Sequence, residues 1–181
     1  GFPKTGTPRA QFIRESVLDL KQNLEKLGAN LVVRKGASAQ AIKELHEQLP
    51  LTAVYCAQEV TYEERQIEEQ VRGLEIPLQS FWNYSLYHLD DLPFKVAHTP
   101  RIFTPFRKKL EKYSSVTEEQ PQPESISVPK DLPWGDVPTL TQLGLEEIIP
   151  DNRAAINFNG GETAAWERLN HYFWEENHLK V

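Results

Sequence analysis

The clearest chemistry-bearing side chains lie in Ala57–Glu64, directly after a predicted buried strand. Its acids include Glu59, which precedes the next predicted helix, and its aromatic ring is Tyr62. A carboxylate just past a strand end can accept paired N–H hydrogen bonds from a flat heterocycle such as a pterin, and Tyr62 offers a face for stacking. Alternatively, acidic side chains here favour the N-terminus of the following helix. We favour this second interpretation for Glu63 and Glu64 and leave both open for Glu59.

A second candidate is the turn Arg34-Lys35-Gly36-Ala37-Ser38, which follows an apolar run. A strand, a glycine turn and a helix N-terminus can present backbone N–H groups to an anion. The segment lacks both the dinucleotide-binding glycine pattern and the P-loop pattern. An ordinary strand-to-helix turn is therefore the favoured interpretation.

Four other groups of residues indicate structure more than chemistry. The five histidines and the single cysteine show no metal-type spacing. Asp90-Asp91 is typical of a turn or cap, and Tyr172-Phe173-Trp174 of core or interface packing, with an electron-transfer relay as the alternative. Arg107-Lys108-Lys109 is typical of a solvated helix face, with nucleic-acid contact as the alternative.

These residues must be positioned by alternating strands and helices. Apolar spacing predicts helices at 9–27, 38–49, 61–71, 103–113 and 162–179, and buried strands at 31–33, 53–56 and 78–82. Ser38 is a predicted N-cap, and Thr61 with Glu64 is a predicted capping box. Strands that alternate with helices pair in parallel. The sequence thus predicts an α/β protein with a doubly wound parallel sheet.

The alternation stops after Trp82. Residues 84–100 lack periodicity, and residues 114–138 are rich in Glu, Gln, Pro and Ser, which predicts a surface connection. One helical turn is expected within 139–144. We therefore divide the chain into an α/β domain at 1–113, a connection at 114–138 and a C-terminal helical segment at 139–181.

The composition restricts the class of protein. The 181 residues include 39% hydrophobic and 25% charged side chains, near the averages of globular domains. A formal charge of −6 and a pI near 5.4 argue against an autonomous nucleic-acid binder, so DNA contact would need a local basic patch. No apolar run is long enough to span a bilayer. The lone Cys56 suits a reducing cytosol or organelle interior, which is the predicted location.

Several stretches, in order along nearly the whole chain, resemble the DASH branch of the cryptochrome/photolyase family. The matching stretches are Gly1–Gly6, Arg9–Phe12 and Glu15-Ser16, Glu59–Thr61 with Glu63-Glu64, Ser85–Phe94, Phe103-Thr104 with Phe106–Lys108, and Gly160–Ala165 with Tyr172–Trp174. The chain departs from the family pattern at Gln58, where a basic residue is usual, and at Asn83-Tyr84, where a Gly-Ser-like pair is usual.

The resemblance implies a Rossmann-like, five-stranded parallel sheet with a pocket for an antenna chromophore. In the family this is typically methenyltetrahydrofolate, which passes excitation to FAD. Carried over by position, Glu59 would hydrogen-bond the pterin ring, and Thr61 and Tyr62 would lie near it. The expected function is an antenna-type domain that binds a folate chromophore and docks an FAD domain.

The resemblance also implies that the chain is not catalytic alone. The helical FAD domain is expected to follow Val181, and the first two strands of the sheet are expected before Gly1. We therefore expect a fragment, or a sheet completed by rearranged pairing or by a partner, with homo-oligomers if the chain stands alone. Expected partners are the FAD-binding helical domain or another copy of the chain, with DNA reached only indirectly. Two alternatives stay open: a piece of a complete light-dependent DNA repair enzyme or blue-light photoreceptor, and an oligomeric interaction protein without chromophore.

Overall fold

A computed structural model describes residues 4–148 and 158–175 of the chain. The described residues form two compact units. One unit draws on residues 1–34 and 122–181, and the other is the continuous segment Lys35–Pro121. Each is described by itself below.

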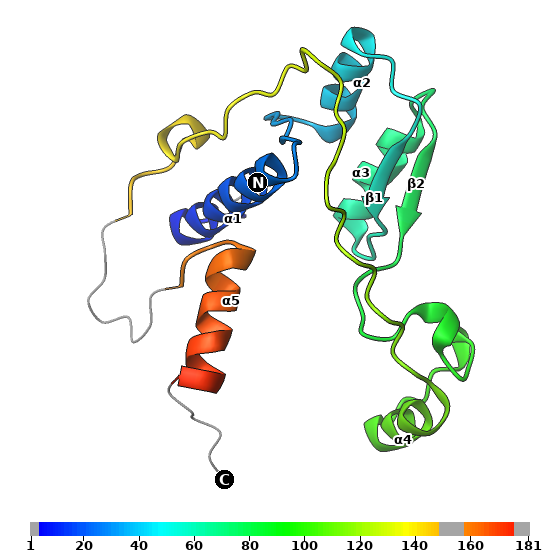
Figure 1. Cartoon of the computed structure of the whole chain (residues 1–181). Coiled ribbons are helices and arrows are strands. Elements are labelled where there is room, and N and C mark those ends of the chain that lie inside the picture. The colour runs from blue at the N-terminus through cyan, green and yellow to red at the C-terminus, as the bar shows by residue number, and fades with distance from the viewer. Residues whose placement is uncertain (1–3, 149–157, 176–181) are drawn as a thin grey trace. The chain divides into compact units, whose positions relative to one another are not determined.

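The continuous unit contains the sheet. Its elements are α2 (Ser38–Gln48), β1 (Val54–Ala57), α3 (Tyr62–Arg72), β2 (Leu78–Phe81), the 3-10 turns η1 (Leu89–Asp91) and η2 (Val96–His98), and α4 (Phe103–Tyr113). β1 and β2 pair in parallel, with Val54 opposite Leu78 and Ala57 opposite Phe81 (Figure 1). The chain passes from β1 to β2 through α3, so the predicted α/β fold class with a parallel sheet is confirmed.

Alternation along both strands gives the sheet two different faces. Val54 and Leu78 are half-buried and line an apolar cavity of about 310 Å³ together with side chains of α2 and α3. Tyr55 and Phe81 point to the other face, where both are exposed and their rings stack with centroids 6.1 Å apart. Among the described residues, the sheet therefore has one apolar face against helices and one face that carries an exposed aromatic pair.

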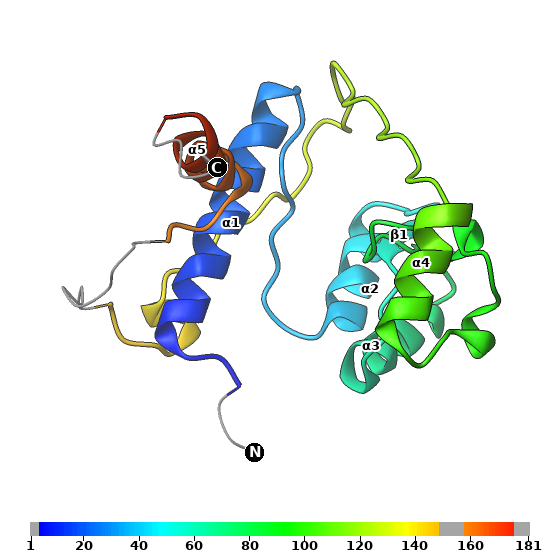
Figure 2. The same cartoon turned by 90° about the horizontal axis from the view of Figure 1, so that it is seen from below.

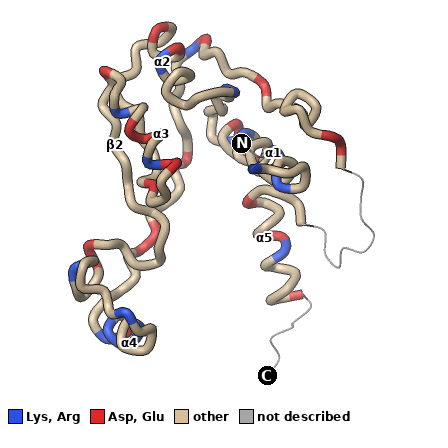
Figure 3. Tube along the Cα trace, turned by 180° about the vertical axis from the view of Figure 1, so that it is seen from behind, with Lys and Arg blue, Asp and Glu red and all other residues tan. Residues whose placement is uncertain are grey.

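α4 packs through one apolar side. Leu110 is buried, and the ring of Phe106 lies 5.8 Å from the ring of Phe94. The hydroxyl of Ser114 donates a hydrogen bond to the carbonyl of Asp91 at 2.7 Å, which fastens the end of α4 to η1. Figure 3 shows that Lys and Arg gather along this helix.

The discontinuous unit joins the first helix to the C-terminal part of the chain. It contains α1 (Thr7–Lys26), the 3-10 turn η3 (Thr141–Leu143), α5 (Glu162–Asn170) and the π-helical turn η4 (His171–Glu175). α1 and α5 lie side by side in both views (Figures 1 and 2). The backbone N–H of Gly160 donates to a carboxylate oxygen of Glu15 at 2.7 Å, and that of Thr163 donates to Asp19 at 3.2 Å. Two acids of α1 thus hold the start of α5.

The predicted connection 114–138 contains no helix or strand among its described residues, as expected. Part of it is nevertheless anchored within the discontinuous unit. The Ile126 N–H donates to the carbonyl of Leu27 at 2.8 Å, and the Arg14 side chain donates to the carbonyl of Pro138 at 3.2 Å. Leu140, just beyond, is 3% exposed. The part of the connection that belongs to this unit, from residue 122 onward, therefore packs with α1.

Three local predictions are wrong. Leu31–Val33 is not a strand: its Val33 N–H donates to the carbonyl of Trp134 at 2.6 Å, a single contact with irregular backbone and not a strand ladder. The N-cap of α2 is Ala37, and Ser38 is already helical. Thr61 does precede α3, but its side chain makes no capping hydrogen bond, so the capping box with Glu64 is not formed.

The remaining elements agree with the sequence patterns within one or two residues. The predicted helix at 162–179 is α5 followed by η4, and its residues 176–179 lie outside the described residues. Among the described residues, no helix is long and apolar enough to cross a membrane.

Candidate functional site

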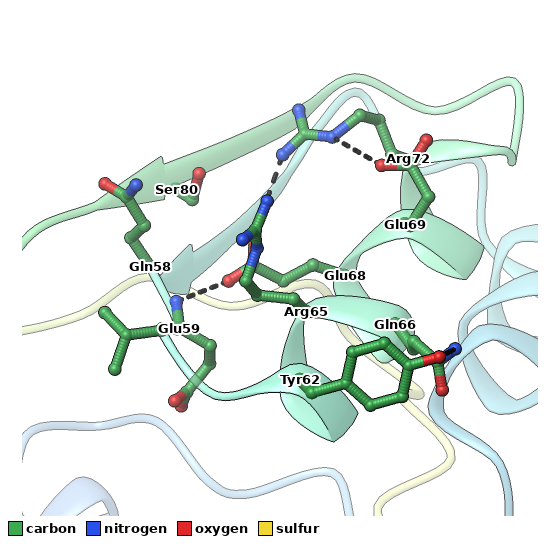
Figure 4. A pocket seen from close by; sticks show the side chains of 10 residues that line it. Gln58, Glu59, Tyr62, Arg65, Gln66, Glu68, Glu69, Arg72 and Ser80 are labelled. Carbon is green, nitrogen blue, oxygen red and sulfur yellow. Dashed lines mark hydrogen bonds and ion pairs between the residues drawn. The ribbon is translucent and has the colours of Figure 1, made fainter.

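One cavity of the continuous unit opens past the carboxyl end of β1. Its volume is about 1020 Å³. The loop residues Gln58, Glu59 and Val60 form one wall, α3 forms another, and Ser80 of β2 contributes from the neighbouring strand (Figure 4). This is the edge of a parallel sheet at which α/β proteins bind ligands.

Two of the three predicted site residues, Glu59 and Tyr62, line the cavity. Thr61 lies between them in the chain, at the start of α3, and is not part of the lining. The Tyr62 side chain is exposed, and its hydroxyl accepts a hydrogen bond from the Gln66 amide at 2.8 Å. The bond between neighbouring turns of α3 fixes the ring at the rim of the cavity.

Glu68 organises the site, although the sequence patterns did not single it out. One of its carboxylate oxygens accepts a hydrogen bond from the backbone N–H of Glu59 at 2.5 Å, and the other lies 3.8 Å from the Arg72 guanidinium. Its side chain is only 15% exposed, in contrast to the neighbouring Glu69. Glu68 thus ties the loop after β1 to α3 and sets the position of Glu59.

The carboxylate of Glu59 has a neighbour from the segment after β2. The side-chain hydrogen bond with Glu59 raises the pKa of the Tyr84 hydroxyl above its ordinary value, with a smaller contribution from desolvation. The Tyr84 ring meets the ring of Trp82 edge-on at 6.0 Å, and the Trp82 indole N–H donates to the Ser85 hydroxyl at 2.7 Å. The departure from the family pattern at Asn83-Tyr84 therefore lies next to the predicted ligand-binding carboxylate.

The cavity is strongly polar and mixed in charge. Arg65 and Arg72 extend from α3 beside Glu68 and Glu69 (Figure 4). Arg72 is shared between the two carboxylates at 3.8 Å each. Such a cavity can hold a polar ligand by hydrogen bonds from both donor and acceptor groups.

Cys56 lies on β1 behind this loop and belongs to the apolar cavity on the other side of Glu59. Burial raises the pKa of the Cys56 thiol, and the Glu68 carboxylate raises it further. A raised pKa keeps the thiol protonated and weakens it as a nucleophile. Among the described residues, no group of three or more His, Cys, Asp or Glu side chains is placed to hold a metal ion.

The other sequence candidates are not among the residues that line this cavity. The Arg34 guanidinium donates to the carbonyl oxygens of Pro133 at 2.6 Å and Val33 at 2.7 Å, so it supports the backbone within its own unit. Asp90 and Asp91 form the turn η1, in agreement with their predicted role. In η4 the Phe173 ring contacts the Tyr172 ring, with centroids 5.1 Å apart, and the Trp174 ring, with centroids 5.6 Å apart.

The fold and the position of the cavity define an α/β, Rossmann-like domain with a parallel sheet. The chain belongs to the DNA photolyase family, whose model matches residues 2–125. It is 40% identical over 184 residues to a cryptochrome DASH of Gloeobacter violaceus, covering 99% of this chain and 37% of that protein. It is also 40% identical to a cryptochrome DASH of Danio rerio, with 97% and 35% covered.

Solved structures agree with this relationship. The crystal structure of a Synechocystis sp. PCC6803 cryptochrome matches with a TM-score of 0.88 and 33% identity, over 99% of this chain and 38% of that chain. A class III photolyase from Agrobacterium tumefaciens shares the fold, with a TM-score of 0.72 and 22% identity over 93% of this chain and 36% of that chain. The chain therefore spans little more than a third of the length of these relatives.

Proposed function

We propose that the chain is an antenna-type domain that binds a folate chromophore, methenyltetrahydrofolate, in the cavity past β1 and docks an FAD-binding helical domain. The cavity that contains both Glu59 and Tyr62 carries this proposal. The proposal is also supported by the chain's membership in the photolyase family and by the fact that the chain covers about a third of each cryptochrome relative.

The residues of the cavity fit a pterin. The backbone N–H of Glu59 is bonded to Glu68, which fixes the loop. The Glu59 carboxylate bonds the Tyr84 hydroxyl and has further lone pairs that can accept hydrogen bonds from a ligand. A carboxylate can take two parallel N–H bonds from the edge of a flat ring, and Tyr62 at the rim supplies an aromatic face. A volume of about 1020 Å³ is ample for a ligand of this size.

When bound, the folate would absorb near-ultraviolet light. The role of this chain is to hold and orient it. Glu59 would bond the ring edge, Glu68 would keep Glu59 in place through the backbone, and Tyr62 would cover one ring face. Thr61 would act only through the backbone at the start of α3, since it does not line the cavity.

The test is uptake of methenyltetrahydrofolate by the purified chain, followed by near-ultraviolet absorption and by titration calorimetry. We expect stoichiometric binding, and a loss of affinity of at least about tenfold in Glu59→Gln, since a hydrogen bond to a charged group contributes about 1.5–3 kcal/mol. Glu63→Gln, which removes an equal charge from a residue that does not line the cavity, is the matched control and should bind normally. Equal affinity in wild type and Glu59→Gln would refute the assigned role of Glu59.

A second candidate, a chromophore-free interaction protein, is favoured by the exposed Tyr55–Phe81 pair on the sheet face. A wild-type chain that takes up no folate but forms a constitutive oligomer would support it. Dispersal of that oligomer by Phe81→Ser would locate the interface on this face.

A further inference from the structure

The two strands of the sheet end side by side, and this brings the loops that follow them together. Ala57 of β1 lies opposite Phe81 of β2. The backbone N–H of Gln58 donates to the carbonyl of Phe81 at 2.8 Å, which extends the pairing by one residue. Glu59 comes next in the first loop, and Tyr84 lies in the loop after β2. Parallel pairing therefore brings both side chains to the same edge of the sheet.

The Tyr84 hydroxyl meets the carboxylate of Glu59 across these two loops, and a hydrogen bond joins them. The bond raises the pKa of the phenol, so the hydroxyl keeps its proton and acts as the donor. Glu59 is thus held twice. Its backbone N–H is bonded to Glu68 of α3 at 2.5 Å, and its carboxylate is bonded to Tyr84. Side chains from α3 and from the loop after β2 therefore converge on Glu59.

The turn that carries Tyr84 is held by contacts of its own. The Trp82 ring meets the Tyr84 ring edge-on, with centroids 6.0 Å apart. The Trp82 indole N–H donates to the Ser85 hydroxyl at 2.7 Å, and that hydroxyl donates to the carbonyl of Tyr87 at 2.6 Å. None of these four residues lines the cavity past β1, so a ligand can enter it without breaking these contacts.

The hydroxyl of Tyr84 and a ligand can use the Glu59 carboxylate at the same time. A carboxylate has about four lone-pair positions on its two oxygens. The hydroxyl takes one position, and the edge of a flat ring that donates paired N–H bonds takes one on each oxygen. The contact with Tyr84 can therefore persist in the complex and fix the plane in which the carboxylate meets the ring edge.

We propose that Tyr84 is a positioning residue for this cavity: it holds the Glu59 carboxylate in the orientation that accepts paired hydrogen bonds from the pterin ring edge. This inference rests on the proposed folate function and adds to it a residue from the loop after β2. Without the hydroxyl, the carboxylate is free to rotate about its side-chain torsions, and binding must then include the entropic cost of fixing it.

The experiment measures the affinity of the full chain for methenyltetrahydrofolate by titration calorimetry in wild type, Tyr84→Phe and Tyr55→Phe. Tyr84→Phe removes only the hydroxyl and keeps the ring that contacts Trp82. Tyr55→Phe is the matched control, because it removes the hydroxyl of an exposed tyrosine that does not line the cavity. We expect Tyr84→Phe to weaken binding about three- to tenfold, as for the loss of one hydrogen bond, and the control to stay within about twofold of wild type.

A second measurement separates positioning from a general effect on folding. In a Glu59→Ala background the hydroxyl has no carboxylate to hold, so Tyr84→Phe should change the affinity by less than about twofold. A residue that only stabilised the fold would weaken binding equally in both backgrounds, and that result would overturn the proposal. Far-ultraviolet circular dichroism checks that each variant folds.

The remaining outcomes distinguish this inference from the function on which it rests. Uptake by wild type with unchanged affinity in Tyr84→Phe would overturn the positioning role and leave the folate site in place. Tighter binding in Tyr84→Phe would also overturn it, because the hydroxyl would then compete with the ligand for Glu59. Absence of uptake by wild type and by every variant would refute the folate function itself, and the positioning role with it.

Discussion

Gly160 is the position at which a single methyl group should be most damaging. A Cβ at this residue would overlap the carbonyl oxygen of Phe12 and would lie 2.8 Å from the Ser16 hydroxyl and 2.9 Å from the Glu15 Cβ. Two of these three atoms belong to the backbone or to the stem of a side chain, so they cannot rotate away. Gly160→Ala must therefore push the segment before α5 away from α1.

The cost has two parts. Overpacking of this kind costs about 1–3 kcal/mol. Displacement also weakens the hydrogen bond from the Gly160 N–H to the Glu15 carboxylate, a charge-assisted bond that contributes about 1.5–3 kcal/mol. The movement that relieves the overpacking is the same movement that weakens the hydrogen bond, so the two costs are not fully additive. We expect a net loss of about 2–4 kcal/mol in the free energy of unfolding.

The assay is equilibrium urea unfolding followed by tryptophan fluorescence, since Trp166 lies on α5. Gly73→Ala is the matched control: at Gly73 φ is −71° and an added Cβ would be 3.4 Å from the nearest atom, an ordinary contact. The control should change the free energy of unfolding by less than about 1 kcal/mol in either direction. A Gly160→Ala protein within about 0.5 kcal/mol of wild type would show that the close approach of α5 to α1 does not constrain the fold.

Two predictions concern titratable groups. Hydrogen bonds from Thr163 lower the pKa of Asp19, so Asp19 stabilises the fold above its ordinary pKa near 3.8, and this contribution is lost as the pH falls through the lower folded value. Asp19→Asn should therefore be less stable than wild type at pH 6 and lose less stability on acidification below pH 4, as urea unfolding across that range would show; parallel pH profiles would contradict the assignment. The Glu59 hydrogen bond raises the pKa of Tyr84, so Glu59→Gln should lower that pKa toward its ordinary value near 10. Ultraviolet phenolate titration, with Tyr84→Phe to identify the signal, measures this, and an unchanged Tyr84 titration in Glu59→Gln would exclude the contact.

The elements that the sequence predicted well are those that local pattern determines. The apolar stripe of α1 and the acidic start of α3 identify helices whose bounds agree closely with the structure. The segment at Leu31–Val33 was wrongly predicted as a strand because an apolar run shows only that a strand is compatible with burial. Whether the segment forms a strand ladder depends on partners far away in the sequence. Here the Val33 N–H bonds the carbonyl of Trp134, which belongs to irregular backbone and not to a strand.

The candidate site was predictable only where local sequence pattern determines the position of a residue. Glu59 and Tyr62 could be placed past a strand end, and both line the cavity, while their ligand remains a prediction. The role of Glu68 was not visible, because a glutamate within a helix of many glutamates has no distinguishing spacing. Only the packing of α3 against the loop after β1 brings it to the Glu59 backbone. The sequence does show paired glycines, Gly160 and Gly161, before a helix. The residue of α1 that Gly160 contacts, Glu15, is 145 positions away and could not be identified from this pattern.

The discontinuity of the first unit has a consequence for the order of events during synthesis. The hydrogen bond between Glu15 and Gly160 joins residues 145 positions apart, whereas the sheet unit is continuous over Lys35–Pro121. At about 5–20 residues per second, a ribosome needs roughly 7–30 s to make the chain between these partners. During this interval α1, with the half-exposed side chains of Phe12, Ile13 and Leu20, awaits its C-terminal partner while the sheet unit can already fold. The contact between α1 and the start of α5 therefore forms only after the whole sheet unit has been synthesised.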